Sequence, residues 1–124
     1  MRDEAEITRR TLTGARGQRA TVVRVVGDVD YDSGPLLADF LREGEDGTER
    51  TVVDLSGLDF ADSTILHVLL DAQRVRRARN GSLVLAGTFS ETVDRLFEVT
   101  GSLSFFVTAP TVEAALDVPL EREA

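Results

Sequence analysis

The residues best suited to chemistry in this chain lie in the segment Asp62-Ser63-Thr64, between an apolar stretch and a long helical pattern. Ser63 stands at the expected N-cap of that helix, where a hydroxyl accepts hydrogen bonds from the unpaired N–H groups of the first turn. The same N–H groups and the positive end of the helix dipole favour a phosphate. Ser63 is therefore predicted either to cap the helix alone or to cap it and also accept a phosphoryl group.

A hydrolytic site is a second interpretation of the same region. Ser63 and His67 are four residues apart, so they share one face of the expected helix. With Asp30 or Asp62 nearby, a serine–histidine–aspartate triad can be drawn. However, no G-x-S-x-G elbow surrounds the serine, and the following residues offer no evident oxyanion hole. His67 is therefore expected to be a surface or interface histidine, no catalytic residue is assigned, and the chain is expected not to be an enzyme.

A calcium site is a third interpretation, and it rests on alternating aspartates. The stretch Asp28-Val29-Asp30-Tyr31-Asp32 matches the opening of a calcium-binding loop. The match then fails, because the sixth position is Ser33 instead of glycine and the twelfth is Asp39 instead of glutamate. Pro35 also predicts the start of a helix where the loop should continue. These aspartates are interpreted as an acidic loop and helix cap, and no metal site is predicted.

The charge of the chain restricts its partners. Its 124 residues include 22 acidic and 14 basic side chains, which give a net charge of −8. Such a surface repels the phosphates of nucleic acids and the headgroups of anionic lipids, so neither nucleic acid nor membrane is expected as a partner. A protein with a basic patch suits this surface better.

Length and composition favour one globular domain that spans residues 1–124. The chain has 42% hydrophobic residues, no cysteine, and no apolar run near the roughly 20 residues that a membrane span needs. Its first ten residues include acidic side chains and no apolar stretch, unlike a signal peptide. A cytoplasmic location is the expectation that follows.

Strand and helix patterns alternate along the chain. Strands are expected at 6–13, 20–26, 51–55, 83–86 and 105–107. Helices are expected from a cap at Asp32 or Ser33 to a stop at 44–47, and then at 63–79, 90–101 and 111–116, with 59–63 as a loop and a frayed tail from 117. This alternation predicts an α/β domain with a core at about 20–116. Its mixed, mostly parallel sheet should have about four to five strands with helices packed on it.

Three short motifs point to a family when they are taken in order. Asp62-Ser63-Thr64, after an apolar strand and a Phe-containing loop, resembles the D-S-[ST]-G-L signature of STAS-domain anti-sigma factor antagonists. Gly27-Asp28-Val29-Asp30 is similar to the G-E-[LI]-D segment of that family. Arg95-Leu96-Phe97 through Gly101, followed by Leu103, is similar to its R-L-F-x-x-x-G-L stretch. The resemblance runs from about residue 20 to residue 116.

The resemblance implies a partner switch. In that family the unmodified antagonist binds an anti-sigma factor that is also an ATP-using serine kinase, and a sigma factor is thereby freed. The kinase phosphorylates the serine that corresponds to Ser63, the antagonist lets go, and a serine phosphatase resets it. The ATP belongs to the kinase, so no cofactor is expected in this chain. The residues expected around the phosphosite and at the partner surface are Asp28, Asp30, Asp62, Thr64, Ile65 and His67.

The chain departs from the family pattern just after the serine. Glycines of the family are replaced by Ile65 and, two residues on, by His67. The family glycines keep the start of the helix slim, so these larger side chains affect how closely a kinase approaches, unless Ile65 turns inward. A phosphorylation-independent docking or scaffold domain in a signalling complex therefore stays open as an alternative, beside the small hydrolase that would use Ser63 and His67.

Overall fold

The structure is a computed structural model, and it describes residues 4–43 and 50–119. Strands and helices alternate along this part of the chain. In chain order the elements are β1 (Glu6–Thr13), β2 (Arg19–Val29), α1 (Gly34–Glu43), β3 (Arg50–Ala61), α2 (Thr64–Ala78), β4 (Ser82–Ala86), α3 (Glu91–Thr100), the 3-10 turn η1 (Leu103–Phe105), β5 (Val107–Ala109) and α4 (Val112–Asp117).

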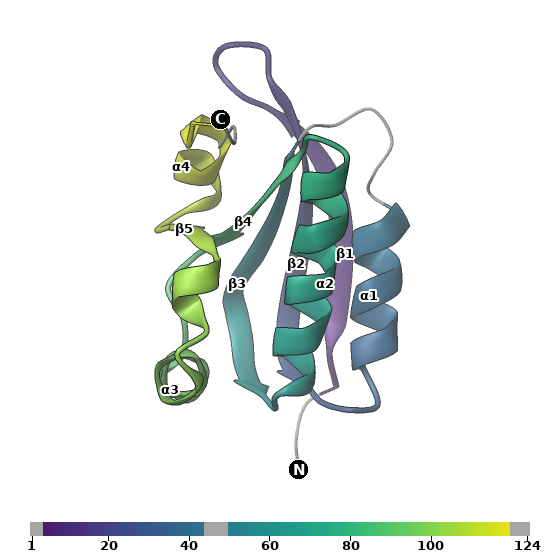
Figure 1. The fold of residues 1–124 in the computed structure, drawn as a ribbon, viewed down its shortest axis with the longest axis vertical. Helices are drawn as coiled ribbons and strands as arrows, with labels where there is room; N and C mark the ends of the chain where they lie inside the picture. Colours follow the sequence, from purple (N-terminus) through teal and green to yellow (C-terminus); the bar gives the residue numbers. More distant parts are fainter. Residues whose placement is uncertain (1–3, 44–49, 120–124) are drawn as a thin grey trace.

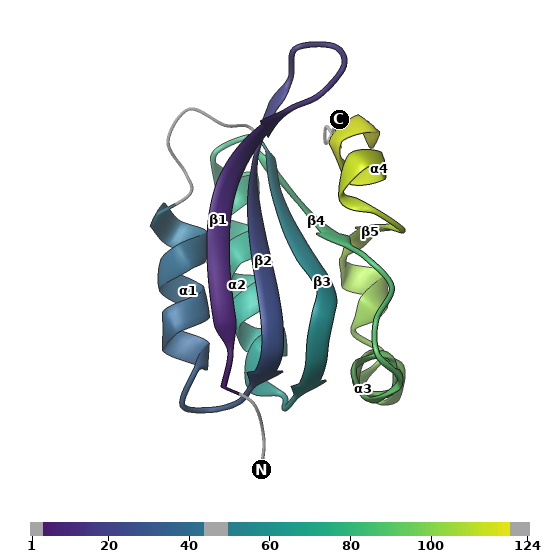
Figure 2. The same cartoon turned by 180° about the vertical axis from the view of Figure 1, so that it is seen from behind.

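Within the described residues, five strands form one mixed sheet in the order β1-β2-β3-β4-β5. β1 is antiparallel to β2, and all the other neighbouring pairs are parallel. α1 and α2 lie together against one face of the sheet, as Figures 1 and 2 show from opposite sides. This architecture confirms the predicted α/β fold with a mixed, mostly parallel sheet.

Each face of the sheet has its own apolar cluster, because successive strand residues point to opposite faces. On one face, Val53 and Leu85 pack with residues of α1, α2 and α3. On the other face, Val52 and Val84 pack against the short helix α4. Valine-rich runs are typical of parallel strands that are buried on both faces. The central strands are therefore fixed from both sides, and their ends hold the connecting turns in place.

Helix α2 forms where the sequence predicts the longest helix, within one residue at each end. Ile65 and Leu69 are fully buried and give the helix its sheet-facing side. The helix ends where Asn80 adopts a left-handed φ of 61° and the Gly81 N–H donates back into the last turn at 2.7 Å. Asn and Gly are the residues that tolerate such a conformation at a helix end.

Strands β2 and β3 are longer than the sequence predicts, and the difference matters for the site. β2 passes through Gly27, the predicted end, and continues to Val29. Gly27 has a φ of 95° and lies at a register shift between β2 and β3, so it allows a bulge instead of ending the strand. β3 likewise runs to Ala61, so residues 59–61, predicted as loop, are strand. β3 therefore ends two residues before Ser63, and the end of β2 lies beside the end of β3.

The last strand begins later than predicted. The run Phe105-Phe106-Val107 predicts a strand, but β5 begins only at Val107, and η1 precedes it. Phe106 is buried with its ring 6.2 Å from that of Phe97 in an edge-to-face arrangement. The chain therefore turns to bury this ring before it pairs with β4. A short apolar run has no clear period, so it does not determine where pairing starts.

The ends of the remaining strands and helices either agree with those predicted from the sequence or lie next to residues that the structure does not describe. β1 coincides with the expected first strand, and β4, α3 and α4 lie within one residue of their predicted bounds. α1 ends at Glu43, and the expected stop at 44–47 lies outside the described residues. Residues 120–124 of the expected frayed tail also lie outside them.

Candidate functional site at the start of helix α2

The candidate site lies where two parallel strands end next to each other. β2 ends at Val29 and β3 at Ala61, and the Asp62 N–H donates to the Val29 carbonyl oxygen at 3.2 Å. This backbone hydrogen bond ties the start of α2 to the turn that precedes α1. Functional residues of open α/β sheets commonly lie outside the carboxyl ends of the strands. The turn of Asp30 and the junction of Ser63 are therefore neighbours.

Asp62, and not Ser63, caps helix α2. Ser63 has helical angles, with φ −62° and ψ −14°, and its side chain makes no capping bond. The Thr64 N–H instead donates to the Asp62 Oδ1 at 2.8 Å. A carboxylate is favourable at this place because the helix dipole is positive at its N-terminal end. The prediction that the Ser63 hydroxyl caps the helix is therefore wrong, and that hydroxyl lies exposed at the surface.

The N–H groups of the first turn are already bonded. The Ile65 N–H donates to the Asp62 carbonyl at 3.2 Å, and the Leu66 N–H donates to the Ser63 carbonyl at 3.1 Å. The Thr64 N–H is held by the Asp62 carboxylate. Because Ser63 itself joins the helical turn, these three donors do not form the open phosphate cradle that the sequence predicts at the helix start.

Asp30 orders the turn between β2 and α1. Its Oδ1 accepts hydrogen bonds from the N–H groups of Asp32 at 3.0 Å and Ser33 at 3.2 Å. In return, the Asp30 N–H donates to the Ser33 Oγ at 2.8 Å. Such side-chain-to-backbone bonds are typical of Asp and Ser in tight turns. The carboxylate proposed as a phosphosite neighbour is therefore occupied in holding its own turn. Asp28 lies just before it, half-buried within β2.

Gly34 and Thr64 bring the starts of α1 and α2 into contact. A Cβ atom on Gly34 would lie 2.5 Å from the Thr64 Cγ2, which is closer than real carbon contacts allow. A glycine as the first residue of α1 therefore lets the two helix starts touch. Thr64 is half-buried in this contact, whereas the neighbouring Ser63 is exposed. Of the two hydroxyl residues, Ser63 is the accessible one.

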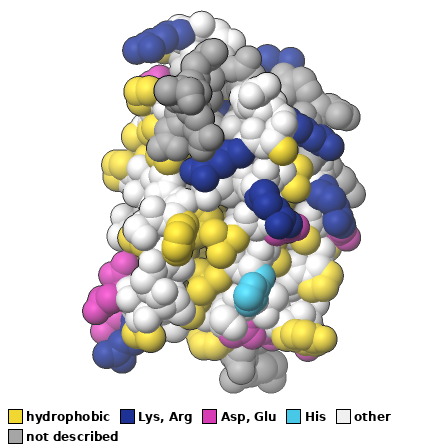
Figure 3. All heavy atoms as spheres, viewed as in Figure 1, with side chains coloured by type: hydrophobic (Ala, Val, Ile, Leu, Met, Phe, Trp, Pro, Cys, Tyr) yellow, Lys and Arg dark blue, Asp and Glu magenta, His cyan; other side chains and the backbone are white. Residues whose placement is uncertain are grey.

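The two residues that depart from the family pattern point in opposite directions. Ile65 is fully buried in the core, so it cannot contact a partner, and its place among the expected partner-binding residues is a correction. It also adds no bulk to the helix surface. His67 is exposed one turn after Ser63, and it has no hydrogen-bond partner within residues 4–43 and 50–119. Figure 3 shows the imidazole at the surface, with acidic side chains directly below it in that view.

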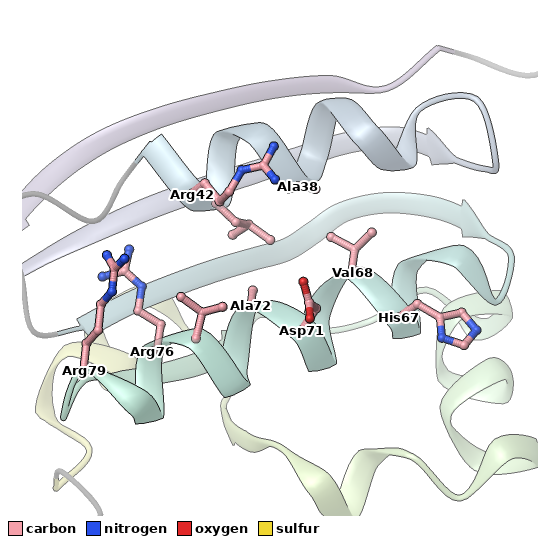
Figure 4. Close-up of a pocket in the computed structure, with 10 residues that line it drawn as sticks. Ala38, Arg42, His67, Val68, Asp71, Ala72, Arg76 and Arg79 are labelled. Carbon is pink, nitrogen blue, oxygen red and sulfur yellow. The ribbon is translucent and has the colours of Figure 1, made fainter.

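A groove of about 640 Å³ runs between α1 and α2. Leu41 and Val68 contribute apolar side chains to its lining, and Arg76 and Arg79 lie at one end. Figure 4 shows His67 at the opposite end, close to the start of α2. At 3.6 residues per turn, Arg76 lies about three turns along the helix from its start. The arginines of α2 are therefore remote from the candidate site.

Two large apolar side chains beside the site are exposed. The helical spacing predicts Leu36 on an apolar helix face, whereas no sequence pattern singles out Tyr31. Tyr31 is 80% exposed in the turn that Asp30 orders, and Leu36 is 46% exposed in the first turn of α1. The available signal was an aromatic residue placed in a turn of aspartate, serine and glycine, where no core can receive it. Exposed aromatic residues of this kind are typical of interface anchors.

Comparisons with known proteins identify the family. A family model described as Mlab, STAS domain, matches residues 13–103, which include β2 through α3. The chain belongs to the STAS family. BtrV of Bordetella bronchiseptica, a protein classed as an anti-sigma factor antagonist, is 36% identical to it over 80 residues, which are 64% of this chain and 68% of BtrV. This STAS domain therefore stands among the anti-sigma factor antagonists.

Solved structures of antagonists share the fold. An anti-sigma factor antagonist from Mycobacterium paratuberculosis aligns with a TM-score of 0.72 at 23% identity, over 90% of this chain and 92% of its own. The antagonist SpoIIAA in its unphosphorylated form aligns with a TM-score of 0.65 at 22% identity, over 89% of this chain and 94% of its own. At these identities the likeness establishes the STAS fold and nothing finer.

The anti-sigma factor antagonists, to which this STAS domain is related, are regulatory proteins and not enzymes. Ser63 and His67 are not hydrogen-bonded to each other within the described residues, so the triad of the hydrolase alternative is not assembled. The described chain also holds no group of three or more His, Cys, Asp or Glu side chains that could bind a metal ion. None of the helices that the structure describes is long and apolar enough to cross a membrane.

Proposed function

We propose that this STAS domain acts in the cytoplasm as an anti-sigma factor antagonist that is controlled by phosphorylation of Ser63. In its unmodified state it binds an anti-sigma factor that is also a serine kinase, and a sigma factor is freed. Transfer of the ATP γ-phosphoryl group to the Ser63 Oγ breaks the complex, and a serine phosphatase restores binding. The kinase carries the ATP site, so this chain needs no cofactor.

The observation that carries the proposal is the accessible, uncommitted hydroxyl of Ser63. Because Asp62 provides the helix cap, modification of Ser63 removes no capping hydrogen bond. The hydroxyl lies at the end of the sheet where the turns before α1 and α2 meet, so a kinase can reach it without unfolding either helix. The same position lies at the centre of the proposed partner surface.

The charge of this region supports disruption by phosphorylation. A phosphoserine adds roughly −1.5 to −2 units of charge at neutral pH. Here that charge would join Asp62 and Asp30 on a protein whose net charge is already −8. At an interface fitted to a neutral hydroxyl, the basic groups of the partner pair with the aspartates around Ser63, so the added charge must be desolvated without a counter-charge of its own. A coupling of about 1–3 kcal/mol, or about 5- to 150-fold in affinity, is an ordinary size for such a switch.

A phosphorylated relative of the same fold exists. SpoIIAA of Bacillus has been solved in its phosphorylated form, which aligns with this chain at a TM-score of 0.65 and 20% identity. The STAS fold therefore accommodates a phosphoryl group in at least one antagonist. This supports the proposal through the fold, and the accessible hydroxyl of Ser63 supports it at the level of the residue.

The surroundings of Ser63 also favour a particular kind of partner surface. Tyr31 and Leu36 offer exposed apolar groups, and the nearby turns carry Asp30, Asp32 and Asp62. Exposed apolar side chains of this type insert into apolar pockets of a partner protein. Basic groups around such a pocket attract the aspartates and increase the rate of association. The proposed partner surface is therefore an apolar pocket bordered by arginine or lysine.

The test is a capture experiment with four versions of the protein. Wild type, Ser63→Ala, Ser63→Asp and Ser104→Asp are immobilised and exposed to extract of the source organism. Ser104 is exposed in η1, so Ser104→Asp adds the same charge away from the site. We expect wild type, Ser63→Ala and Ser104→Asp to recover one kinase-like anti-sigma factor, and Ser63→Asp to recover at least tenfold less of it.

The recovered partner then allows a direct test of the modification. Purified partner with ATP should add one phosphoryl group to the wild type, and mass spectrometry should place it on Ser63. Ser63→Ala should remain unmodified although it still binds. Equal recovery by Ser63→Asp and wild type, with no transfer to Ser63, would instead establish the phosphorylation-independent docking domain.

A further inference from the structure

A phosphoryl group on Ser63 would enter acidic surroundings. The segments 26–41 and 57–73 cover the ends of β2 and β3, the two turns, most of α1 and the first ten residues of α2. They stop just before Arg42 and Arg74, which pair with Asp39 and Asp71. The first contains four aspartates and the second contains three, and neither contains arginine or lysine. His67 is the one basic side chain in them, and it is the only histidine of the chain. No other cationic group of these segments can balance the added charge.

The helix start does not balance that charge with open donors either. Its first N–H groups are bonded to the Asp62 carboxylate, the Asp62 carbonyl and the Ser63 carbonyl. A phosphate that binds them must displace existing hydrogen bonds. The counter-charge must therefore come from a side chain within reach of the Ser63 Oγ.

His67 has the geometry for this role. Ser63 has helical backbone angles at the start of α2, and His67 follows four residues later on the same helix. At this spacing, side chains are neighbours with Cβ atoms about 5–6 Å apart. Both residues are exposed, and the imidazole has no other hydrogen-bond partner within the described residues. Either ring N–H can thus turn towards a phosphate oxygen.

We propose that His67 is the phosphate-binding residue of the Ser63-phosphorylated protein. The inference rests on the proposed function, in which Ser63 is the modified residue. The imidazolium donates an N–H to a phosphomonoester oxygen and neutralises part of its charge. His67 thereby holds the phosphoryl group against the α2 surface in the modified state, and it is an uncommitted surface residue in the unmodified state.

Such a pair depends on pH, because phosphoserine and histidine side chains in general change charge near neutrality. The second pKa of phosphoserine is about 6, and that of an unperturbed histidine is about 6.5. The phosphate raises the histidine pKa, and the imidazolium lowers the phosphate pKa, so the two titrations are coupled. The pair is strongest near pH 6–7 and is lost as the pH rises through the raised histidine pKa.

Other charged groups around His67 set the background of this titration. Asp71 follows on α2 and is paired with Arg74, and Asp39 on α1 is paired with Arg42. The remaining charged groups on the neighbouring turns, strand ends and groove are Asp28, Asp30, Asp32, Asp59, Asp62, Arg76 and Arg79. These groups are present in both states, so the difference between the states isolates the effect of the phosphate.

The experiment uses NMR titration, since one histidine gives one set of imidazole signals. Phosphoserine is installed at position 63 during translation, so no kinase is needed, and the unmodified protein is compared with it. Phosphoserine at position 104, an exposed site in η1, is the control for added charge elsewhere. We expect phosphorylation at 63 to raise the His67 pKa by about 0.5 unit or more, and phosphorylation at 104 to change it less than half as much.

A reciprocal measurement makes the assignment specific. By linkage, the phosphorus-31 signal of phosphoserine 63 should titrate at a higher pKa in His67→Gln than in the wild type, by a similar amount. An unchanged His67 pKa, an equal shift from phosphoserine 104, or a phosphate pKa indifferent to His67→Gln would each overturn the inference. None of these outcomes depends on whether a kinase modifies Ser63, so they are separate from failure of the proposed function.

Discussion

At the start of helix α2, Asp62 caps the helix and Ser63 carries the hydroxyl that is proposed for phosphorylation. The Asp62 carboxylate takes the Thr64 N–H and supplies negative charge at the positive end of the dipole. Ser63 adopts helical angles, and its side chain makes no capping hydrogen bond. The residue proposed for modification is therefore separate from the residue that stabilises the helix.

This division predicts that two alanine substitutions change the free energy of unfolding by different amounts. Asp62→Ala should lower the free energy of unfolding by about 1 kcal/mol, because the cap is lost. Ser63→Ala should change it by less than about 0.5 kcal/mol, because no capping bond is removed. Urea denaturation of both variants measures the difference. A larger loss for Ser63→Ala than for Asp62→Ala would contradict this assignment of the cap.

At the residue scale, the sequence predicted the start of helix α2 at Ser63 better than the role of each side chain there. It placed Ser63 at a helix start, because an apolar strand and a helical period flank it. It could not decide that Asp62 would cap, since either side chain is a good N-cap and the choice depends on the backbone angles of Ser63. The inward direction of Ile65 follows from packing against the sheet, and the family pattern does not contain that information.

Two helices can carry one site only if their starts are held together. α1 and α2 meet where Gly34 faces Thr64, and the backbone bond from Asp62 to Val29 joins the turns beneath them. The contact leaves no room for a larger side chain at the first residue of α1. The relative position of Tyr31 and Ser63 therefore depends on one glycine.

The substitution Gly34→Ala tests this contact. Alanine has the better intrinsic helix propensity, by about 0.8–1.0 kcal/mol. We nevertheless expect a loss of about 1–3 kcal/mol in the free energy of unfolding, because the new Cβ overlaps the Thr64 Cγ2. Thr64→Ser removes that methyl group and should restore at least half of the loss in the double variant. Denaturation of the wild type, the two single variants and the double variant gives a double-mutant cycle. Additive changes in the free energy of unfolding would show that Gly34 and Thr64 are not in contact.

Helix α4 is too short to be stable alone, and a buried arginine fastens it to the sheet. The Arg50 Nη1 donates to the carbonyls of Ala115 at 2.8 Å and Leu116 at 3.1 Å, and its Nε donates to the Ser82 Oγ at 3.1 Å. Arginine at the C-terminal end of a helix also suits the negative end of the dipole. The bond network joins β3, β4 and α4.

Arg50→Met should therefore destabilise the protein by about 2–3 kcal/mol, because buried carbonyl oxygens lose their donors. Hydrogen exchange should show the α4 amides losing protection first. Arg24→Met is the matched control on β2, where the arginine is exposed, and it should change stability by less than about 0.5 kcal/mol. Equal effects of the two substitutions would mean that Arg50 does not hold α4.

At the element scale, the order and type of the elements were predictable, and some ends were not. Periodicity and terminators define α2 and α3 well, because their apolar faces and end residues agree. The ends of β2, β3 and β5 depend on long-range pairing. Gly27 ends a strand in isolation but forms a bulge when β3 continues beside it, and Phe106 turns inward because Phe97 is there to receive it.

Within the described residues, charge differs between the two ends of α2 and of the strands beside it. The carboxyl ends of β2 and β3 carry aspartates and the exposed Tyr31, whereas the arginines of α2 lie in its last turns. This arrangement gives an acidic surface with an aromatic anchor at one end. It suits a partner with an apolar pocket and a basic rim better than a broad, flat interface.

Tyr31→Ala should weaken binding to the recovered anti-sigma factor by at least tenfold, because an exposed anchor loses its contact. Tyr31→Phe should stay within threefold of the wild type, since the ring supplies most of the buried area. Isothermal titration calorimetry measures both variants. Val99 is 77% exposed on α3, so Val99→Ala is the matched control and should have no effect. Equal affinities for Tyr31→Ala and Val99→Ala would exclude Tyr31 as an anchor.

The inward orientation of Ile65 has a consequence for how such regulators can diverge or be redesigned. Folding constrains Ile65 and Thr64, whereas Ser63 and His67 lie outside and can vary without disturbing the core. A duplicated copy could therefore change the partner it recognises through outward positions alone and keep its thermal stability. An engineer who wants two insulated copies of this switch in one cell should keep Ser63, vary the other exposed residues around it, and leave the buried Ile65 untouched.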